Sequence, residues 1–212
     1  MILVSGSAGM LALRLAEEAE RRGDRVALAA PPVPEPRAGR RRGICRFPSD
    51  CGDPEGCDLL IEAVVEKFSR LDAVIATAAA PEVGALDALS MEEWQQSVIA
   101  PLRRTFWLAR RVVWEFLAAG GGGRLVFVTE PPIEGPASSR GEPNEIIGAA
   151  LVSLARSIAK EVGRRAVACN VVLVASGGPS AADPLPPMVE AALYLASKDA
   201  SFVNGEALTV RV

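Results

Sequence analysis

The segment NEIIGAALVSLARSIAKEVG, residues Asn144–Gly163, decides how the rest of the chain is organised. Apolar residues recur in it at steps of three and four, which is the spacing of one face of an α-helix. They are Ile147, Leu151, Leu154, Ile158 and Val162. The small residues between them, which let a neighbouring backbone approach closely, are Ala149, Ala150, Ala155 and Ala159. We therefore predict one long helix here, buried along a single apolar stripe.

Short apolar runs alternate with helical spacing along the chain. Ile2–Ser5 is followed by apolar residues at helical spacing as far as Gly23, and Val26–Ala30 is the next apolar run. A strand, a helix and a strand in close succession form a βαβ unit, which requires a parallel sheet. Further runs at Leu71–Ala79 and Arg124–Thr129 continue the alternation. The sequence therefore predicts an α/β fold.

The composition is that of an ordinary globular protein. The chain has 212 residues, half of them hydrophobic, and a formal net charge of -3. This balance suits a single domain over residues 1–212 and gives no electrostatic reason to expect a nucleic acid partner. No apolar run reaches the length of a membrane span, and no basic region precedes the first apolar run as in a signal peptide. We therefore expect a cytoplasmic protein with no membrane partner.

The cysteines and histidines give no reason to expect a metal site. Cys45, Cys51 and Cys57 are spaced six residues apart, which is not a common zinc spacing, and Cys169 is remote from them. The chain has no histidine, so Ser-His-Asp and Cys-His nucleophilic schemes are excluded. We expect four buried, reduced thiols and no metal.

The segment quoted first also carries a family pattern. Its residues Gly148-Ala149-Ala150-Leu151 match K-A-A-L in the pattern Y-x-x-x-K-A-A-L-x-x-L-x-R-x-x-A-x-E. The segment thereby closely resembles the long helix of the short-chain dehydrogenase/reductase (SDR) family. The resemblance places Asn144 where the family has its catalytic Tyr and Gly148 where it has its catalytic Lys. In the family the Tyr donates or accepts the proton and the Lys lowers its pKa.

The other two positions of the family's catalytic tetrad are also changed. Pro101-Leu102 matches the family's N-L, so Pro101 stands where the catalytic Asn would be. For the catalytic Ser, the spacing to Asn144 assigns Pro131, whereas the strand alignment assigns Glu130. The resemblance thus implies a degenerate member of the family without catalytic residues. Its tetrad positions are occupied by Pro101, Pro131 or Glu130, Asn144 and Gly148.

The family's phosphate-binding loop, T-G-x-x-x-G-x-G, is only partly matched. Ser5-Gly6 matches T-G, whereas Met10 and Ala12 fall on the second and third glycines and Gly9 lies one place early. Those glycines let backbone N–H groups approach the pyrophosphate closely. Met10 would place a flexible side chain at that point.

Other features on the cofactor side are weakened as well. Asp50 is the first residue of a D-C-G-D-P-E stretch that resembles the family's D-V-x-D-P-E, in which the first Asp contacts the adenine. The same stretch can also be explained as a turn and helix cap, because Asp53 precedes a proline. Ala76, Thr77 and Ala79 replace two asparagines and a glycine, which leaves this edge of the cleft apolar. The vestigial residues are Ser5, Gly6, Gly9 and Asp50. We expect this chain to bind no cofactor.

The resemblance implies a Rossmann-like, doubly wound parallel sheet of about seven strands in the order 3-2-1-4-5-6-7. Residues 31–36, PPVPEP, follow the second strand, and prolines remove donors and clash with a helical turn. We therefore expect one crossover helix to be lost there.

A second long helical pattern covers residues 101–119. One apolar face is predicted from Phe106, Ala109, Val113 and Leu117, with Trp107 and Trp114 beside it. Pro101 is expected to bend or restart the helix.

The resemblance also implies how the chain functions. Family members assemble through their two long helices, here residues 101–119 and 144–163, which keep clean apolar patterns. Our hypothesis is a non-catalytic subunit that pairs with an active SDR subunit in a hetero-oligomeric dehydrogenase. We expect the complex to be a heterotetramer and to act on a hydroxyacyl-CoA. The partner subunit would hold NAD or NADP. Two alternatives remain: an atypical oxidoreductase or lyase that uses Glu130 as its base, or a nucleotide-sensing regulator. Both alternatives require the isolated chain to bind a nucleotide.

Overall fold

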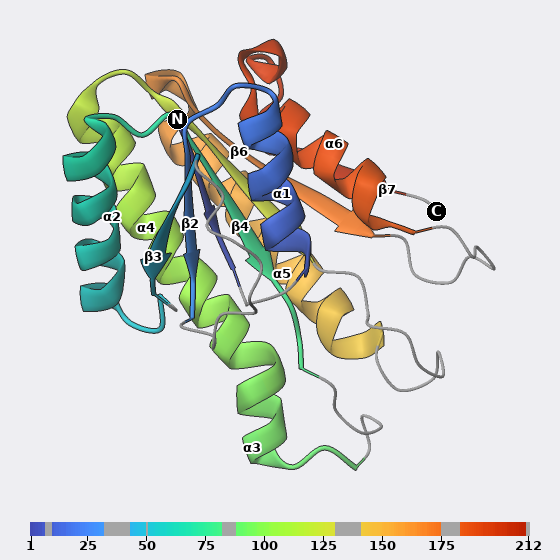
Figure 1. The fold of residues 1–212 in the computed structure, drawn as a ribbon. Coiled ribbons are helices and arrows are strands. Elements are labelled where there is room, and N and C mark those ends of the chain that lie inside the picture. The colour runs from blue at the N-terminus through green and yellow to red at the C-terminus, as the bar shows by residue number, and fades with distance from the viewer. Residues whose placement is uncertain are drawn as a thin grey trace.

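The computed structural model describes residues 1–6, 10–31, 43–49, 51–81, 88–129, 141–174 and 183–210. Seven parallel strands form one sheet in the order β3-β2-β1-β4-β5-β6-β7, which confirms the predicted order (Figure 1). The strands are β1 (Ile2–Ser5), β2 (Val26–Ala30), β3 (Ile44–Pro48), β4 (Ala73–Ala78), β5 (Gly123–Thr129), β6 (Val167–Val174) and β7 (Ala207–Val210). The crossover predicted to have lost its helix falls on residues 32–42, outside the described part of the chain.

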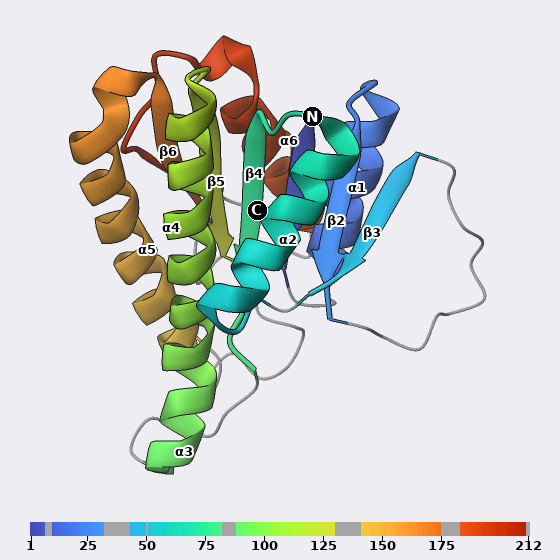
Figure 2. The same ribbon diagram turned by 90° about the vertical axis from the view of Figure 1, so that its left-hand side faces the viewer.

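Helices cover both faces of the sheet, so the fold is doubly wound. The helices are α1 (Met10–Arg21), α2 (Pro54–Phe68), α3 (Met91–Trp94), the π-helix η2 (Gln95–Ile99), α4 (Ala100–Ala119), α5 (Gly141–Val162) and α6 (Leu185–Ala196), with 3-10 turns at Gly163–Arg165 and Lys198–Ala200. Helices α1 and α6 pack on one face, and α2, α4 and α5 lie side by side on the other (Figure 2).

Each strand contributes side chains to two separate cores because successive side chains of a strand point to opposite faces. On β1, Leu3 belongs to the core under α2, α4 and α5, whereas Ile2 and Val4 belong to the core under α1 and α6. All six residues of β4 are buried. This double burial explains why the central strands are almost continuously apolar in sequence rather than alternating.

Helix α5 largely matches the helix predicted over residues 144–163, although it begins at Gly141. Ile147, Leu151 and Val162 are buried as predicted. The other two members of the predicted stripe, Leu154 and Ile158, are only partly buried, and the fully buried Ala155 lies between them. The core-facing line of α5 is therefore narrower than the sequence pattern indicated.

The apolar face predicted for residues 101–119 is partly wrong. The residues of α4 that are buried against the sheet are Pro101, Thr105, Leu108, Ala109, Val112 and Phe116. Phe106 and Trp114 are instead 45% and 61% exposed. The physical reason is that α4 carries apolar residues on two faces, and periodicity alone does not tell which face meets the core.

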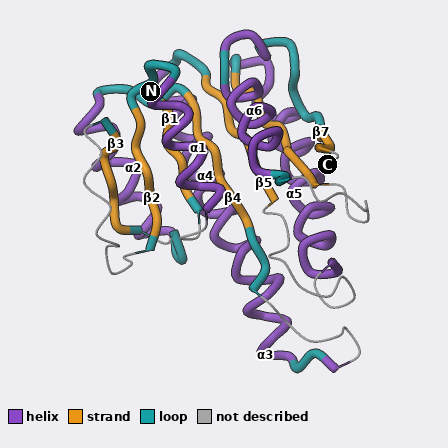
Figure 3. The backbone as a smooth tube through the Cα atoms, turned by 45° about the vertical axis from the view of Figure 1, so that its right-hand side comes forward, coloured by secondary structure: helices purple, strands orange, loops and turns teal. Residues whose placement is uncertain are grey.

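Pro101 lies in the first turn of α4, where the α-helix begins again after the π-helix, as the predicted restart requires. The chain runs helically from α3 through η2 into α4 and extends beyond the sheet (Figure 3). The π-helix ends directly before α4, where the Ala100 N–H bonds the carbonyl of Gln95 five residues earlier. Pro101 has no N–H and its ring would crowd the carbonyl of Ser97 in a regular α-helical turn, so the wider π turn accommodates it.

Candidate functional site

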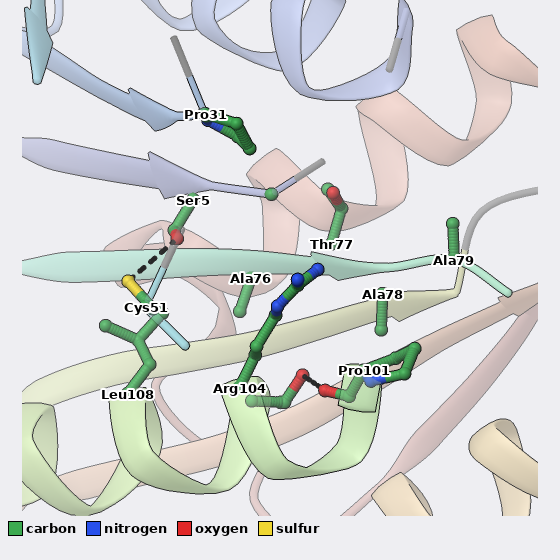
Figure 4. Close-up of a pocket in the computed structure, with 12 residues that line it drawn as sticks. Ser5, Pro31, Cys51, Ala76, Thr77, Ala78, Ala79, Pro101, Arg104 and Leu108 are labelled. Atoms are coloured by element: carbon green, nitrogen blue, oxygen red, sulfur yellow. Dashed lines mark hydrogen bonds between the residues drawn. The ribbon is translucent and has the colours of Figure 1, made fainter. Parts of the chain in front are cut away.

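A small cavity lies at the carboxyl ends of β1 and β4, where the strand order reverses direction (Figure 4). In open α/β sheets this reversal is the point at which ligands bind. The cavity encloses about 50 Å³. It is lined by Ser5, Gly6, Pro31, Cys51, Ala76, Thr77, Ala78, Ala79, Pro101, Arg104, Thr105 and Leu108.

The two described residues of the vestigial phosphate loop pack against neighbouring elements. A Cβ atom on Gly6 would lie 2.0 Å from the Thr77 hydroxyl oxygen, so a side chain at this position would require Thr77 to shift. Ser5 is buried, and its Oγ lies 3.7 Å from Cys51 Sγ. Gly9 and Asp50, the other two vestigial residues, lie outside the described part of the chain.

Arg104 provides the positive charge of this cavity. Its side chain extends from α4 toward the end of β4, between Ala76 and Thr77 in the view of Figure 4. No acidic side chain among the described residues forms an ion pair with it. Prolines, alanines and Leu108 form most of the remaining wall, in line with the apolar edge expected from the sequence.

The position that the resemblance assigns to the catalytic Lys is occupied by packing. Gly148 is buried in α5, and a Cβ atom placed on it would lie 3.2 Å from Leu173 Cδ2 and 3.6 Å from Thr129 Cγ2. Leu173 of β6 and Thr129 of β5 thus fill the space next to the helix backbone. A side chain at this position would require Leu173 to move by a few tenths of an ångström.

The position assigned to the catalytic Tyr is part of a structural hydrogen bond. The Asn144 side chain lies at the start of α5, and its Oδ1 accepts the backbone N–H of Ala80 at 2.9 Å. It therefore ties α5 to the segment that follows β4. At the position assigned to the catalytic Asn, the carbonyl of Pro101 accepts the Thr105 hydroxyl at 3.0 Å. Both candidates for the Ser position, Glu130 and Pro131, lie outside the described residues.

The fold implies a nicotinamide dinucleotide at this end of the sheet, and the cavity lined by the described residues is smaller than such a ligand requires. Sites for ligands of that class enclose roughly 300–1,000 Å³, several times the volume of this cavity. Thr77 lies directly against Gly6, and the Arg104 side chain lines the cavity. As the described residues are placed, the cavity has room for a few water-sized groups only.

The thiols are not set up as nucleophiles or metal ligands. A hydrogen bond with Cys51, followed by burial, raises the pKa of Cys57, and burial raises the pKa of Cys169, so both thiols stay protonated at neutral pH. Across the described residues, no three side chains of the metal-binding types come together. No helix in the same part of the chain is long and apolar enough to cross a membrane.

Sequence reasoning missed Arg104 and Leu173. Arg104 follows Pro101 by three residues, which puts both on the same face of the helix. This spacing is the signal in the sequence that predicts Arg104 beside the cavity. Leu173 comes from a strand 25 residues away from Gly148, and no local pattern signals that contact.

Several known proteins are similar to this chain in sequence. A family model described as enoyl-(acyl carrier protein) reductase matches residues 6–179. The (2S)-[(R)-hydroxy(phenyl)methyl]succinyl-CoA dehydrogenase subunit BbsD of Thauera aromatica is 25% identical over 182 residues, covering 76% of this chain and 72% of BbsD. The (3R)-3-hydroxyacyl-CoA dehydrogenase of Mus musculus is 27% identical over 152 residues, covering 71% of this chain and 58% of that enzyme. The match therefore spans less than two thirds of the mouse enzyme.

Solved structures share the whole architecture. A short-chain dehydrogenase from Leptospira borgpetersenii with bound NAD+ has a TM-score of 0.81 at 16% identity, covering 98% of this chain and 90% of that one. The acetoin dehydrogenase YohF from Salmonella typhimurium has a TM-score of 0.76 at 18% identity, covering 100% of this chain and 94% of that one. With the family model matching most of its length, the chain belongs to the short-chain dehydrogenase/reductase family.

Proposed function

We propose that this chain is a non-catalytic subunit that pairs with an active SDR subunit in a cytoplasmic, hetero-oligomeric NAD(P)-dependent dehydrogenase. The observation that supports the proposal is the packing at Gly148, where Leu173 and Thr129 lie 3.2 and 3.6 Å from the position of a Cβ atom. A general acid without its activating cation loses most of its effect. The nucleotide, NAD or NADP, is held by the partner, and this chain holds none.

The substrate class comes from the relatives. BbsD is named as a subunit of a CoA-thioester dehydrogenase, and the mouse relative is a hydroxyacyl-CoA dehydrogenase. We accordingly assign the complex to oxidation or reduction of a hydroxyacyl-CoA, with the chemistry on the partner. We propose a heterotetramer, assembled through residues 101–119 and 144–163.

Helices α4 and α5 offer the surface for this assembly. They lie next to each other on the same face of the sheet (Figure 2). Phe106 and Trp114 of α4 are exposed, and Leu154 and Ile158 of α5 are only partly buried. Large exposed apolar side chains that gather on one face are typical of a protein interface.

Calorimetry on the purified chain tests whether it binds a nucleotide. Titration with NADH and with NADPH should give no heat of binding. Co-expression with the SDR genes next to its own should yield a complex that binds one nucleotide per two chains, because only the partner has a competent cleft. The proposal is wrong if the chain alone forms an active homo-oligomer. Micromolar nucleotide binding to the isolated chain would favour an atypical oxidoreductase or a nucleotide-sensing regulator instead.

A further inference from the structure

Helix α4 concentrates positive charge in a protein that is acidic overall. Its sequence, APLRRTFWLARRVVWEFLAA, contains four arginines and one glutamate, whereas the whole chain has a formal net charge of -3. Arginines are thus enriched in this helix relative to the chain as a whole. It lies on the same helix that the proposed function assigns to the interface.

One of these arginines is neutralised within the protein. Arg111 bonds Asp58 of α2 at 3.0 Å and Glu115 of its own helix at 2.9 Å, and its side chain is only 13% exposed. Arg103 and Arg110 differ, because both are exposed and neither forms an ion pair with any acidic side chain of the described residues. Their charges remain available to a partner.

Arg103 and Arg110 lie among aromatic side chains. Arg103, Phe106 and Arg110 are separated by three and four residues, so they share one side of the helix. The Arg110 guanidinium lies 5.5 Å from the centre of the Trp107 ring, and the Phe106 and Trp107 rings meet edge to face at 5.1 Å. We call Arg103, Phe106, Trp107, Arg110 and Trp114 the arginine–aromatic face. Arg and Trp are the residue types that dominate binding energy at protein interfaces.

The neighbouring helix does not offset this charge. Among the side chains of α5 that the structure describes, the exposed charged ones are Glu145, Arg156, Lys160 and Glu161, two of each sign. The joint surface of α4 and α5 is therefore positive. Two copies of one chain that meet about a twofold axis bring the same patch of each together. A symmetric dimer through this surface would bring two positively charged patches together.

We infer that the arginine–aromatic face selects an SDR subunit that carries aspartates or glutamates on its corresponding helix and disfavours a second copy of this chain. This inference rests on the proposed function and adds the chemistry of the partner to it. The aromatic rings supply apolar contact area to any helix of suitable shape. The unpaired guanidinium groups make the affinity for an acidic partner higher than the affinity for a second copy, since like charges brought together at an interface repel each other.

A charge-reversed copy of the same chain is the probe for this inference. In the double variant Arg103→Glu/Arg110→Glu, the face keeps its aromatic residues and presents carboxylates. Sedimentation equilibrium would compare wild type alone, the variant alone, and an equimolar mixture. The mixture should associate at least about tenfold more tightly than either protein alone, a difference of about 1.4 kcal/mol. This preference should shrink between about 0.01 M and 1 M salt as the Debye length falls from about 30 to 3 Å.

Two further variants serve as controls for the effect of charge. Arg14→Glu/Lys198→Glu changes the net charge equally at exposed sites away from α4, and its mixture with wild type should show no such preference. Arg103→Gln/Arg110→Gln removes the repulsion alone and should self-associate more tightly than wild type. A wild-type dimer as tight as the mixed pair at low salt, or no association in the mixture, overturns the inference. These outcomes are independent of nucleotide calorimetry, so failure of the charge inference is distinct from failure of the proposed function.

Discussion

Placing a lysine at position 148, where the resemblance assigns the family's catalytic Lys, is the most direct test of the packing around Gly148. In the structure, a Cβ atom on Gly148 would already lie 3.2 Å from Leu173 Cδ2, which is tight but relieved by a small movement of that flexible side chain. Gly148→Ala therefore adds little strain and gains about 0.5–1 kcal/mol from better helix propensity. We expect this variant to be as stable as wild type or slightly more stable.

Gly148→Lys is expected to behave differently. Its longer side chain must push Leu173 aside, and overpacking of this kind costs about 1–3 kcal/mol. Its amino group also enters a corner of aliphatic side chains without an acidic partner among the described residues, which costs about 1–3 kcal/mol more. After subtracting the gain in propensity, Gly148→Lys should lose about 3 kcal/mol of unfolding free energy. For a domain of this size, that lowers Tm by about 6–12 °C.

Urea denaturation of the two variants measures this difference directly. The double variant Gly148→Lys/Leu173→Ala makes room for the new side chain, so its loss should be smaller than the sum of the two single losses by more than about 0.5 kcal/mol. A Gly148→Lys protein as stable as Gly148→Ala, or strictly additive losses in the double variant, would refute the packing argument. NADH binding gained by Gly148→Lys would show that the cleft is open rather than filled.

Three further predictions follow from single contacts. Asn144→Ala should lower the free energy of unfolding by about 1–2 kcal/mol, because it leaves the Ala80 N–H without its acceptor. Asn144→Asp keeps an acceptor oxygen, and hydrogen exchange of the Ala80 amide measures the difference between the two variants. With a thiol reagent in native conditions, the partly exposed Cys45 should react first, and Cys169, whose pKa is raised by burial, should react only on unfolding; early labelling of Cys169 would contradict its burial. Hydrogen bonds from Arg21 and Arg22 lower the pKa of Glu18 to about 2. The contribution of Glu18 to stability is therefore complete above its unfolded pKa of 4.5 and is lost as the pH falls through about 2. Carboxyl titration by NMR should show this midpoint, and an ordinary midpoint would show that the ion pairs do not persist in solution.

The nearest neighbours in sequence determined the local elements. The capping box at Ser90, where the Ser90 side chain and Glu93 bond each other's backbone N–H groups, sets the start of α3 from four residues alone. Asp53 and Pro54 likewise set the start of α2, since the Asp53 side chain accepts the Gly56 N–H and proline needs no donor at that place. Such contacts span three residues, so a reader of the sequence can find them.

The sequence by itself also determined the fold. Alternating apolar runs and helical spacings require parallel strands with crossover helices, and the resemblance to SDR proteins supplied the strand order that the structure has. It further assigned Pro101, Asn144 and Gly148 to the positions of the family's catalytic residues. These features follow from local spacing or from matched patterns along the chain.

Only the tertiary structure decided what those residues do. Leu173 fills the space beside Gly148, Thr77 lies against Gly6, and Asn144 bonds the backbone of Ala80, and each of these pairs is separated by 25 to 71 positions in the chain. The choice of the buried face of α4 was likewise made by the sheet and by α5, since both faces of that helix are apolar. Spacing fixes the angle of a side chain around its own helix axis, whereas its neighbours depend on how distant segments pack in three dimensions.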